Sequence, residues 1–343
     1  MARSARSRFG GMLAFLLIAS VLLGPSVSAL STRLSIATGG TGGVYYPYGG
    51  ALANLLSTEL DDTEVTAEVT AASVDNMLLI EDGGADIAFV LGDTAFDATQ
   101  GREQFETPVN GQALATLYNN YTQIVVKTDS GINTVADLAG KRVSVGSPGS
   151  GTEVIANRML TVSGIDPASG ITVERLGVAE SAGAMKDNKL DAFFWSGGLP
   201  TSAITDLGAT PNITIKLLPH ADVAPALQEA YGAFYTTDTI PANTYPNQAE
   251  DVEVVVVPNV LVVNAEMDEE LAYTITKVMF EGQAALAAAH PAAAELTLEN
   301  AVATSPIPYH PGALRYYTEQ GVGIATPAAS PVASPVASPV PSS

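Results

Sequence analysis

Short apolar segments alternate with longer, helix-like segments along most of the chain. Apolar runs, mostly of four to seven residues, predict strands at 34–37, 65–69, 87–90, 123–126, 142–145, 171–176, 192–195, 213–217 and 252–263. The last run contains Pro258, which divides the strand or places it at a sheet edge. Helices fit residues 48–58, 74–82, 134–138, 152–162, 181–187, 201–207, 268–289 and 311–320. This alternation predicts α/β layers with largely parallel sheets.

A glycine-rich turn joins the first strand to the first helix. Residues 34–48 read LSIATGGTGGVYYPY, so the glycines lie between an apolar strand and an apolar helix. Glycines let the backbone approach a ligand, and the free N–H groups of the helix start face the same point. The turn is therefore a candidate site for a carboxylate or phosphate, although similar turns also occur without a ligand. The tyrosines that follow add apolar faces and hydroxyl groups.

A second turn of the same kind follows about 105 residues later. Residues 143–153 read VSVGSPGSGTE, which is again a strand, a glycine turn and a hydroxyl residue that opens a helix. Ligands of α/β sheets collect at the carboxyl ends of strands, so each turn is expected at the rim of its own sheet. Two helix N-termini that converge across a cleft suit a small molecule with two negative or strongly polar ends.

The same turns fit other chemistries poorly. The first lacks the third glycine of a dinucleotide fingerprint and the lysine of a P-loop. Neither Ser147 nor Ser150 stands in the Gly-x-Ser-x-Gly pattern of a hydrolase. The three histidines lack metal-ligand spacing, and the chain has no cysteine. We therefore predict no catalytic residue, no metal site and no cofactor, and an exported hydrolase is the weakest alternative.

The first 29 residues have the pattern of a secretory signal peptide. Three arginines precede an apolar stretch at 12–23, and the small residues Val27, Ser28 and Ala29 follow it. The apolar stretch is shorter than the roughly 20 residues that span a bilayer, which favours cleavage over a retained anchor. The sequence thus predicts an exported protein, in the periplasm or at the cell surface.

The charge and the C-terminal end refine this picture. Because the signal segment holds three arginines and no acid, its removal changes the formal net charge from −21 to −24. An acidic surface repels nucleic acid and favours a soluble monomer, and an acidic face that docks on a basic membrane protein is a further option. Residues 325–343 repeat Ser-Pro-Val-Ala and predict an extended, disordered tail, either a spacer or a dispensable end.

Several motifs taken together resemble the TAXI branch of the solute-binding proteins of TRAP transporters. They follow one another across the chain: IATGGTGGVYYP at 36–47, SVDN at 73–76, ADIAFV at 85–90, DSGI at 129–132, DLAGKRV at 137–143, VGSPGSGTE at 145–153, DAFFW at 191–195 and YHPGA at 309–313. Their number and order carry the resemblance. It implies a receptor that captures a solute outside the membrane and delivers it to a TRAP-type permease.

The resemblance also implies a type II periplasmic-binding-protein fold. In that fold two α/β lobes are joined by a hinge of two crossing strands and close on the ligand. The crossings are expected near residues 123–127 and 254–263. Lobe one then comprises residues 30–123 and 258–324, and lobe two comprises residues 124–257.

The family is expected to bind small carboxylates such as glutamate, glutamine or 2-oxoglutarate. By position, the resemblance assigns ligand contacts to Gly40, Thr41, Gly42, Gly43, Tyr45, Tyr46, Ser73, Asn76 and Asp93 in lobe one, and to Ser147, Gly149, Ser150, Thr152 and Trp195 in lobe two. Other interpretations stay open for some of them. Trp195 also fits a core position, Asp93 a helix cap, and Ser150 and Thr152 caps without a ligand.

The chain departs from the family pattern at two places near the expected cleft. Asn119-Asn120 stands where relatives often carry Pro-Glu, and Leu91-Gly92 stands where a Gln-Ser pair is common. Both changes are expected to alter the choice of ligand. The leading hypothesis is a non-catalytic TRAP receptor for a small carboxylate. The alternative is a sensory binding protein that has the same site and signals to a membrane receptor.

Overall fold

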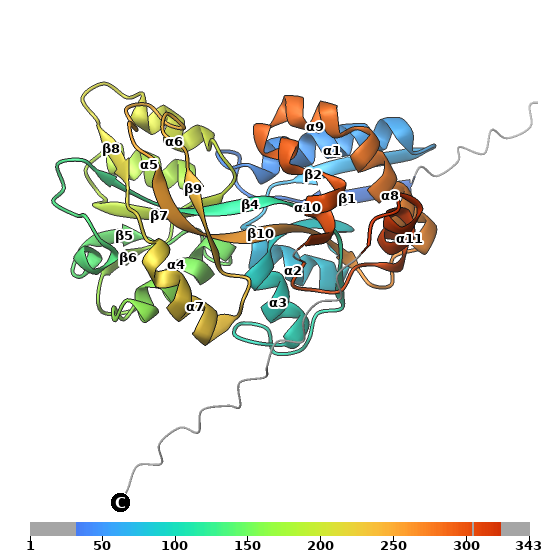
Figure 1. Cartoon of the computed structure of the whole chain (residues 1–343), viewed down its shortest axis with the longest axis horizontal. Coiled ribbons are helices and arrows are strands. Elements are labelled where there is room, and N and C mark those ends of the chain that lie inside the picture. Colours follow the sequence, from blue (N-terminus) through green and yellow to red (C-terminus); the bar gives the residue numbers. More distant parts are fainter. Residues whose placement is uncertain (1–31, 304, 324–343) are drawn as a thin grey trace, which may run out of the picture.

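A computed structural model describes residues 32–303 and 305–323. The predicted signal peptide and the predicted tail lie outside these residues. The described part forms two α/β lobes joined by two long strands, which confirms the predicted fold class (Figure 1). None of its helices combines the length and the apolar character needed to cross a bilayer.

One mixed sheet runs through both lobes. Its strands are β1 (Thr32–Ala37), β2 (Thr63–Glu68), β3 (Ile87–Leu91), β4 (Gly111–Lys127), β5 (Arg142–Ser144), β6 (Thr172–Glu174), β7 (Ala192–Gly197), β8 (Ile215–Leu217), β9 (Thr236–Ile240) and β10 (Val252–Asn264). The order is β2-β1-β3-β10-β4-β7-β5-β6, with β8 beside β4 and β9 beside β10. Within each lobe the strands β1–β3 and β5–β7 are parallel, whereas β10 is antiparallel to both β3 and β4.

Helices cover both faces of this sheet (Figure 1). They are α1 (Tyr45–Glu59), α2 (Ser73–Asp82), α3 (Gly92–Gln100), α4 (Gly151–Val162), α5 (Val178–Lys186), α6 (Ser202–Gly208), α7 (Ala224–Tyr231), α8 (Glu269–Glu281), α9 (Gln283–Ala289), α10 (Leu298–Ala303) and α11 (Pro311–Glu319). Three short 3-10 helices are η1 (Val135–Leu138), η2 (Ala221–Val223) and η3 (Pro291–Glu295). Lobe one contains α1–α3 and α8–α11, and lobe two contains α4–α7.

The two strands that join the lobes are β4 and β10. β10 pairs with β3 in lobe one and β9 in lobe two, and β4 lies along its other side. The prediction that Pro258 divides this strand or puts it at an edge is wrong, because β10 continues through Pro258 between neighbouring strands. Pro258 falls between the residues that pair with β9 and those that pair with β3. Proline has no backbone N–H to donate, and Pro258 lies at the point where β10 changes its partner from β9 to β3.

Other differences from the prediction have local causes. β4 begins at Gly111, well before the predicted start at residue 123. The prediction missed its first half because polar residues such as Gln112 and Asn119 interrupt the apolar pattern there. α3, α7, α10 and β9 were not predicted, and the segment predicted as a helix over 134–138 is a 3-10 helix. The helix expected over 268–289 divides at Gly282, where the backbone meets the Leu55 side chain of α1 so closely that a Cβ has no room.

Buried side chains form one core in lobe one and a separate core on each face of the sheet in lobe two. Phe193 and Phe194 are neighbours in β7 and alternate between these faces. Phe193 packs with α5 and α6, whereas Phe194 packs with α4 and α7. This packing fixes the starts of α4 and α5 near the carboxyl ends of β5 and β7, on the side that faces lobe one.

Gly312 provides a test of the packing between α11 and α8. A Cβ at Gly312 would lie 2.6 Å from the backbone nitrogen of Tyr273 and against the carbonyl of Glu269. We expect Gly312→Ala to lower the free energy of unfolding by about 1–3 kcal/mol, because the two backbones must separate. Gly50→Ala is the matched helical control, since nothing lies within 4 Å of its Cβ, and should raise stability by up to about 1 kcal/mol. Guanidinium unfolding measures both, and equal stabilisation would contradict the packing.

Candidate functional site

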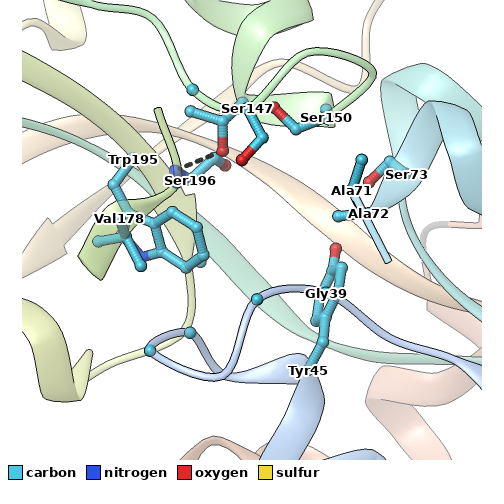
Figure 2. A pocket seen from close by; sticks show the side chains of 18 of the residues that line it. Gly39, Tyr45, Ala71, Ala72, Ser73, Ser147, Ser150, Val178, Trp195 and Ser196 are labelled. Carbon is cyan, nitrogen blue, oxygen red and sulfur yellow. Dashed lines mark hydrogen bonds between the residues drawn. The ribbon is translucent and has the colours of Figure 1, made fainter. Parts of the chain in front are cut away.

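A cavity of about 300 Å³ lies between the lobes and is lined by both glycine-rich turns. Its remaining lining comes from the start of α2, the end of β3, the segment between β6 and α5, and the end of β7. Figure 2 shows Tyr45 on one side, Trp195 and Val178 on a second, Ser147 and Ser150 on a third, and Ala71, Ala72 and Ser73 on the fourth. The two turns therefore converge on one space, as the sequence predicts.

Four helices begin at this cavity. The first residues of α1, α2, α4 and α5 all belong to its lining: Tyr45, Ser73, Gly151 and Val178. The N-terminus of a helix carries free N–H groups and the positive end of the helix dipole. Four such ends around one cavity create a positive potential that favours an anion, even though the whole chain is strongly acidic.

The first amides of α2 are already used by the opposite lobe. The Gly149 carbonyl of the second turn accepts hydrogen bonds from the Val74 and Asp75 amides, at 3.1 and 3.2 Å. At the start of α4, the Ser150 hydroxyl accepts a hydrogen bond from the Glu153 amide at 3.1 Å. Ser150 is thus an N-cap, as one of the sequence interpretations holds. The remaining helix starts, chiefly those of α1, α4 and α5, offer amides to a ligand.

Hydroxyl groups supply most of the polar side chains of the lining. Ser73 accepts a hydrogen bond from the Leu91 amide at 3.0 Å, and Thr152 accepts one from the Ser196 amide at 3.2 Å. Each hydroxyl keeps its own proton to donate. The Ser147 hydroxyl points into the open space in Figure 2. Amides and hydroxyls together therefore present donors, which is the requirement for a carboxylate ligand.

Among the described residues that line the cavity, Arg175 carries the one positively charged side chain. Its Nε lies 2.7 Å from Oε1 of Glu153, and the side chain is half exposed. Glu180 adds a negative charge to the same lining. Arg175 was not predicted from the sequence, because it follows a short strand of three residues and stands in no recognisable motif. The Nη groups of Arg175 are not part of this ion pair and can donate to an anion.

Trp195 combines the two roles considered for it. The indole N–H donates a hydrogen bond to Thr201 Oγ1 at 2.8 Å, and the ring packs partly against the core on the α5–α6 face. The other side of the ring lines the cavity. A Cβ at Gly43 would lie 2.7 Å from this ring, so glycine at that position allows the first turn to approach Trp195.

The lobes touch on both sides of the cavity. On one side lies the contact of Gly149 with α2, and on the other the Ser202 hydroxyl donates to the Gly42 carbonyl at 3.1 Å. A Cβ at Gly42 would lie 3.0 Å from the Cβ of Ala179 in α5. These contacts close the cavity from both directions, so the structure represents a closed arrangement of the lobes.

The family follows from a comparison of the whole sequence. A family model described as the NMT1-like family matches residues 36–321. The chain belongs to the NMT1-like family. Its fold is similar to that of periplasmic solute-binding proteins, and the following structures are examples.

The periplasmic aliphatic sulphonate binding protein of Escherichia coli is 16% identical with a TM-score of 0.46, covering 84% of this chain and 83% of that chain. The alkanesulfonate-binding protein of Xanthomonas axonopodis pv. citri, bound to MOPS, is 18% identical with a TM-score of 0.43, covering 90% and 89%. A structure from work on glutathione import in Streptococcus mutans is 14% identical with a TM-score of 0.48, covering 76% and 93%. Similarity at this level does not identify the ligand of this NMT1-like protein.

Most of the predicted site residues line the cavity of this NMT1-like protein: Gly40, Thr41, Gly42, Gly43, Tyr45, Ser73, Ser147, Ser150, Thr152 and Trp195. Their contact with a ligand stays a prediction. Four others lie elsewhere: Tyr46 is exposed on α1, and Gly149 reaches the lining of a second cavity. Asn76 is fully buried, and its Nδ2 donates to the carbonyls of Thr38 and Phe89, both at 2.8 Å. Asn76 thus links the end of β1 to β3 through these hydrogen bonds.

Asp93, the fourth, belongs to a buried ion cluster between the lobes. Arg158 on α4 reaches both Asp93 and Asp97 on α3, and Tyr235 donates a hydrogen bond to Asp93 at 2.7 Å. We refer to Asp93, Asp97, Arg158 and Tyr235 as the Arg158 cluster. Burial raises the pKa of Asp93 and raises that of Asp97 to about 6, against the opposing effect of Arg158. Asp93 therefore binds the second lobe and does not face the cavity.

A second cavity of about 340 Å³ lies beside the Arg158 cluster. Its charged lining residues are Arg158, Glu103 and Glu153. Arg158 is already paired with Asp97, and Glu153 with Arg175. Because Arg158 and Glu153 are already engaged in ion pairs, we assign no ligand to this cavity. In the described ranges 32–303 and 305–323, no cluster of three or more metal-ligating side chains occurs.

Ala72 marks a strained position at the edge of the first cavity. Its φ of 85° and ψ of −144° lie in a region that residues with a Cβ rarely adopt. Ala72 precedes α2, and its carbonyl accepts the first helical hydrogen bond, from Asn76, at 2.8 Å. Strain of this kind is retained where the surrounding structure requires it, and here it directs the α2 start toward the cavity.

Proposed function

We propose that this protein is an extracytoplasmic solute receptor that binds a small carboxylate between its lobes. The observation that carries the proposal is the convergence of the N-termini of α1, α4 and α5 and a set of hydroxyl donors on one interlobe cavity. The cavity volume of about 300 Å³ suits a small molecule and excludes a polymer. Because the contacts that enclose the cavity join one lobe to the other, ligand binding and lobe closure are coupled.

The carboxylate binds at the starts of α4 and α5, with Arg175 at the mouth as its cation. Amides at a helix start hold an anion without the side-chain entropy that a flexible cation loses. Glutamate, glutamine and 2-oxoglutarate are the candidate ligands. The protein performs no chemistry on the solute in this proposal, since its lining offers hydrogen-bond donors and no arrangement of nucleophile and base among the described residues.

The closed form delivers the solute to a TRAP-type membrane permease of the TAXI branch. The shared motifs support this partner, and the pattern of the first 29 residues supports export. Within the fold, we place the lobe boundaries in β4 near residue 123 and in β10 near residue 257, where both strands pass between lobes. The alternative is a sensory binding protein whose closed form is recognised by a membrane receptor. Co-purification with a permease encoded by a neighbouring gene distinguishes the two.

The first test measures thermal unfolding of the refolded protein with amino acids, 2-oxo acids, dicarboxylates, sugars and phosphates. Refolding removes any ligand carried through purification. A ligand at about a hundred times its dissociation constant stabilises by roughly 2.7 kcal/mol, which raises the midpoint by several degrees. We expect such a shift for carboxylates alone. A shift for sugars or phosphates without one for carboxylates would overturn the proposed ligand class.

A further inference from the structure

Two buried asparagines lie beneath Tyr45 on the strands that join the lobes. Asn120 is on β4 and Asn259 is on β10, and both are fully buried. Within the described part of the chain, neither polar atom of Asn120 has a hydrogen-bond partner, and Oδ1 of Asn259 has none either. Leaving a buried amide unpaired is costly, so these groups are expected to bind something polar.

Tyr45 connects these asparagines to the cavity. Nδ2 of Asn259 donates a hydrogen bond to the Tyr45 hydroxyl at 2.6 Å, which leaves the hydroxyl proton free to point elsewhere. Figure 2 shows that the hydroxyl points into the cavity. Ser73, Asn120 and Asn259 all lie close enough to this hydroxyl to oppose the effect of burial on its pKa. Tyr45 is therefore the one member that lines the cavity in a buried polar cluster, which we call the Tyr45 cluster (Tyr45, Asn120 and Asn259).

The Tyr45 cluster carries no formal charge, and the charged side chain that acts on it is the carboxylate of Asp93. Burial raises the pKa of Tyr45, and the nearby negative charge of Asp93 raises it further. The cation on that side, Arg158, is held by Asp97 and Tyr235 and does not line the cavity. A second carboxylate placed against this cluster would have no cation to compensate the loss of its hydration.

We propose that the Tyr45 cluster binds an uncharged amide or hydroxyl group of the ligand, so that the protein selects a monocarboxylate with a neutral polar end over a dicarboxylate. This inference rests on the proposed carboxylate receptor and narrows its ligand class. The primary amide of a glutamine-like molecule matches the cluster best, since it offers both donors and an acceptor. Tyr45 donates to the amide oxygen. Asn259 acts as a positioning residue, because it orients that hydroxyl.

The test is isothermal titration of the refolded protein with L-glutamine, L-asparagine, L-glutamate and 2-oxoglutarate. We expect L-glutamine to bind at least tenfold more tightly than L-glutamate and 2-oxoglutarate, the dicarboxylates of equal length. Asn120→Leu should reduce the affinity for the amide compounds at least tenfold. The same change should leave the ligand-free melting temperature unchanged or higher, because it replaces an unpaired buried amide with an apolar group of similar volume.

Thr116→Val is the matched control. Thr116 lies on the same strand, is buried and, in the described structure, has an unpaired hydroxyl. Like Asn120 it does not line the cavity, but it is not among the groups that act on the Tyr45 hydroxyl. It should leave affinity unchanged. If Asn120→Leu does not fold, Tyr45→Phe is the second variant. It keeps the ring and removes the hydroxyl, and it should show the same loss of affinity.

Each outcome decides between the inference and the proposed function. Binding of dicarboxylates with equal or higher affinity overturns the selection by the Tyr45 cluster and leaves the carboxylate receptor intact. Unchanged amide affinity in both Asn120→Leu and Tyr45→Phe does the same. Failure of the wild-type protein to bind any of the four compounds, with a thermal shift for another chemical class, overturns the proposed function and this inference together.

Discussion

Arg158→Met is expected to lower the free energy of unfolding by about 3–5 kcal/mol, because it leaves two carboxylates buried without their cation. Arg158 is 5% exposed, and Asp93 and Asp97 are 0% and 3% exposed. Methionine preserves much of the side-chain volume, so the loss of stability comes from the missing charge more than from a cavity. Arg33→Met is the control, since Arg33 pairs with Glu64 at the surface and such pairs contribute at most about 1 kcal/mol. Guanidinium unfolding at pH 7.5 measures both variants.

The same variant has a defined pH dependence. In the wild type, the pKa of Asp97 is raised to about 6 in the folded state from about 3.9 when unfolded. The folded state therefore binds more protons between about pH 4 and pH 6, and this group makes stability fall as pH rises through that window. Without Arg158 both carboxyl pKa values rise further. The deficit of Arg158→Met should thus be smaller at pH 5 than at pH 7.5, and a larger deficit in acid would contradict a cost due to buried charge.

The two turns and the fold class were predictable because they depend on local patterns. A strand, a glycine turn and a capped helix occupy consecutive positions, so residues 34–48 and 143–153 reveal their chemistry without tertiary information. The joining strands were predictable in place but not in length. β4 combines buried polar residues, such as Asn120 and Thr122, with buried apolar ones. A search for apolar runs cannot detect such a strand.

The charged contacts between the lobes were not predictable, because they join residues far apart in the sequence. Arg158 and Asp97 are separated by 61 positions, and neither stands in a motif. Asp93 was placed at the ligand because it follows a strand end, which is the usual place for a site residue. In the structure its carboxylate turns to Tyr235 instead. Strand ends therefore indicate the level of the site in the sheet, while the opposite lobe decides which side chains face it.

Both glycine turns make contacts with the opposite lobe. At Gly42 the first turn meets Ala179 of α5 and Ala203 of α6, and its carbonyl accepts from Ser202. At Gly149 the second turn meets the start of α2. Both glycine turns thus line the cavity and also form contacts between the lobes. A side chain at either turn changes the closed state more than the fold of a single lobe.

Gly42→Val is therefore expected to weaken ligand binding by about ten- to hundredfold while each lobe stays folded. The valine side chain has no space against Ala179, whose Cβ would already lie 3.0 Å from a Cβ at position 42. Overpacking of about 1–3 kcal/mol acts on the closed state alone, because the open state separates these residues. Titration with the most stabilising carboxylate measures the affinity, and small-angle X-ray scattering measures whether ligand still makes the molecule more compact.

Gly50→Val is the control for this change, because position 50 lies on α1 with nothing within 4 Å of its Cβ. It should keep wild-type affinity. Wild-type affinity in Gly42→Val, with a normal decrease in size on ligand addition, would show that the contact between the first turn and α5 does not limit closure. A loss of affinity together with unfolding at room temperature would instead assign Gly42 to the stability of lobe one. The expected combination, a normal melting temperature without ligand and a weak, incomplete closure with it, separates these cases.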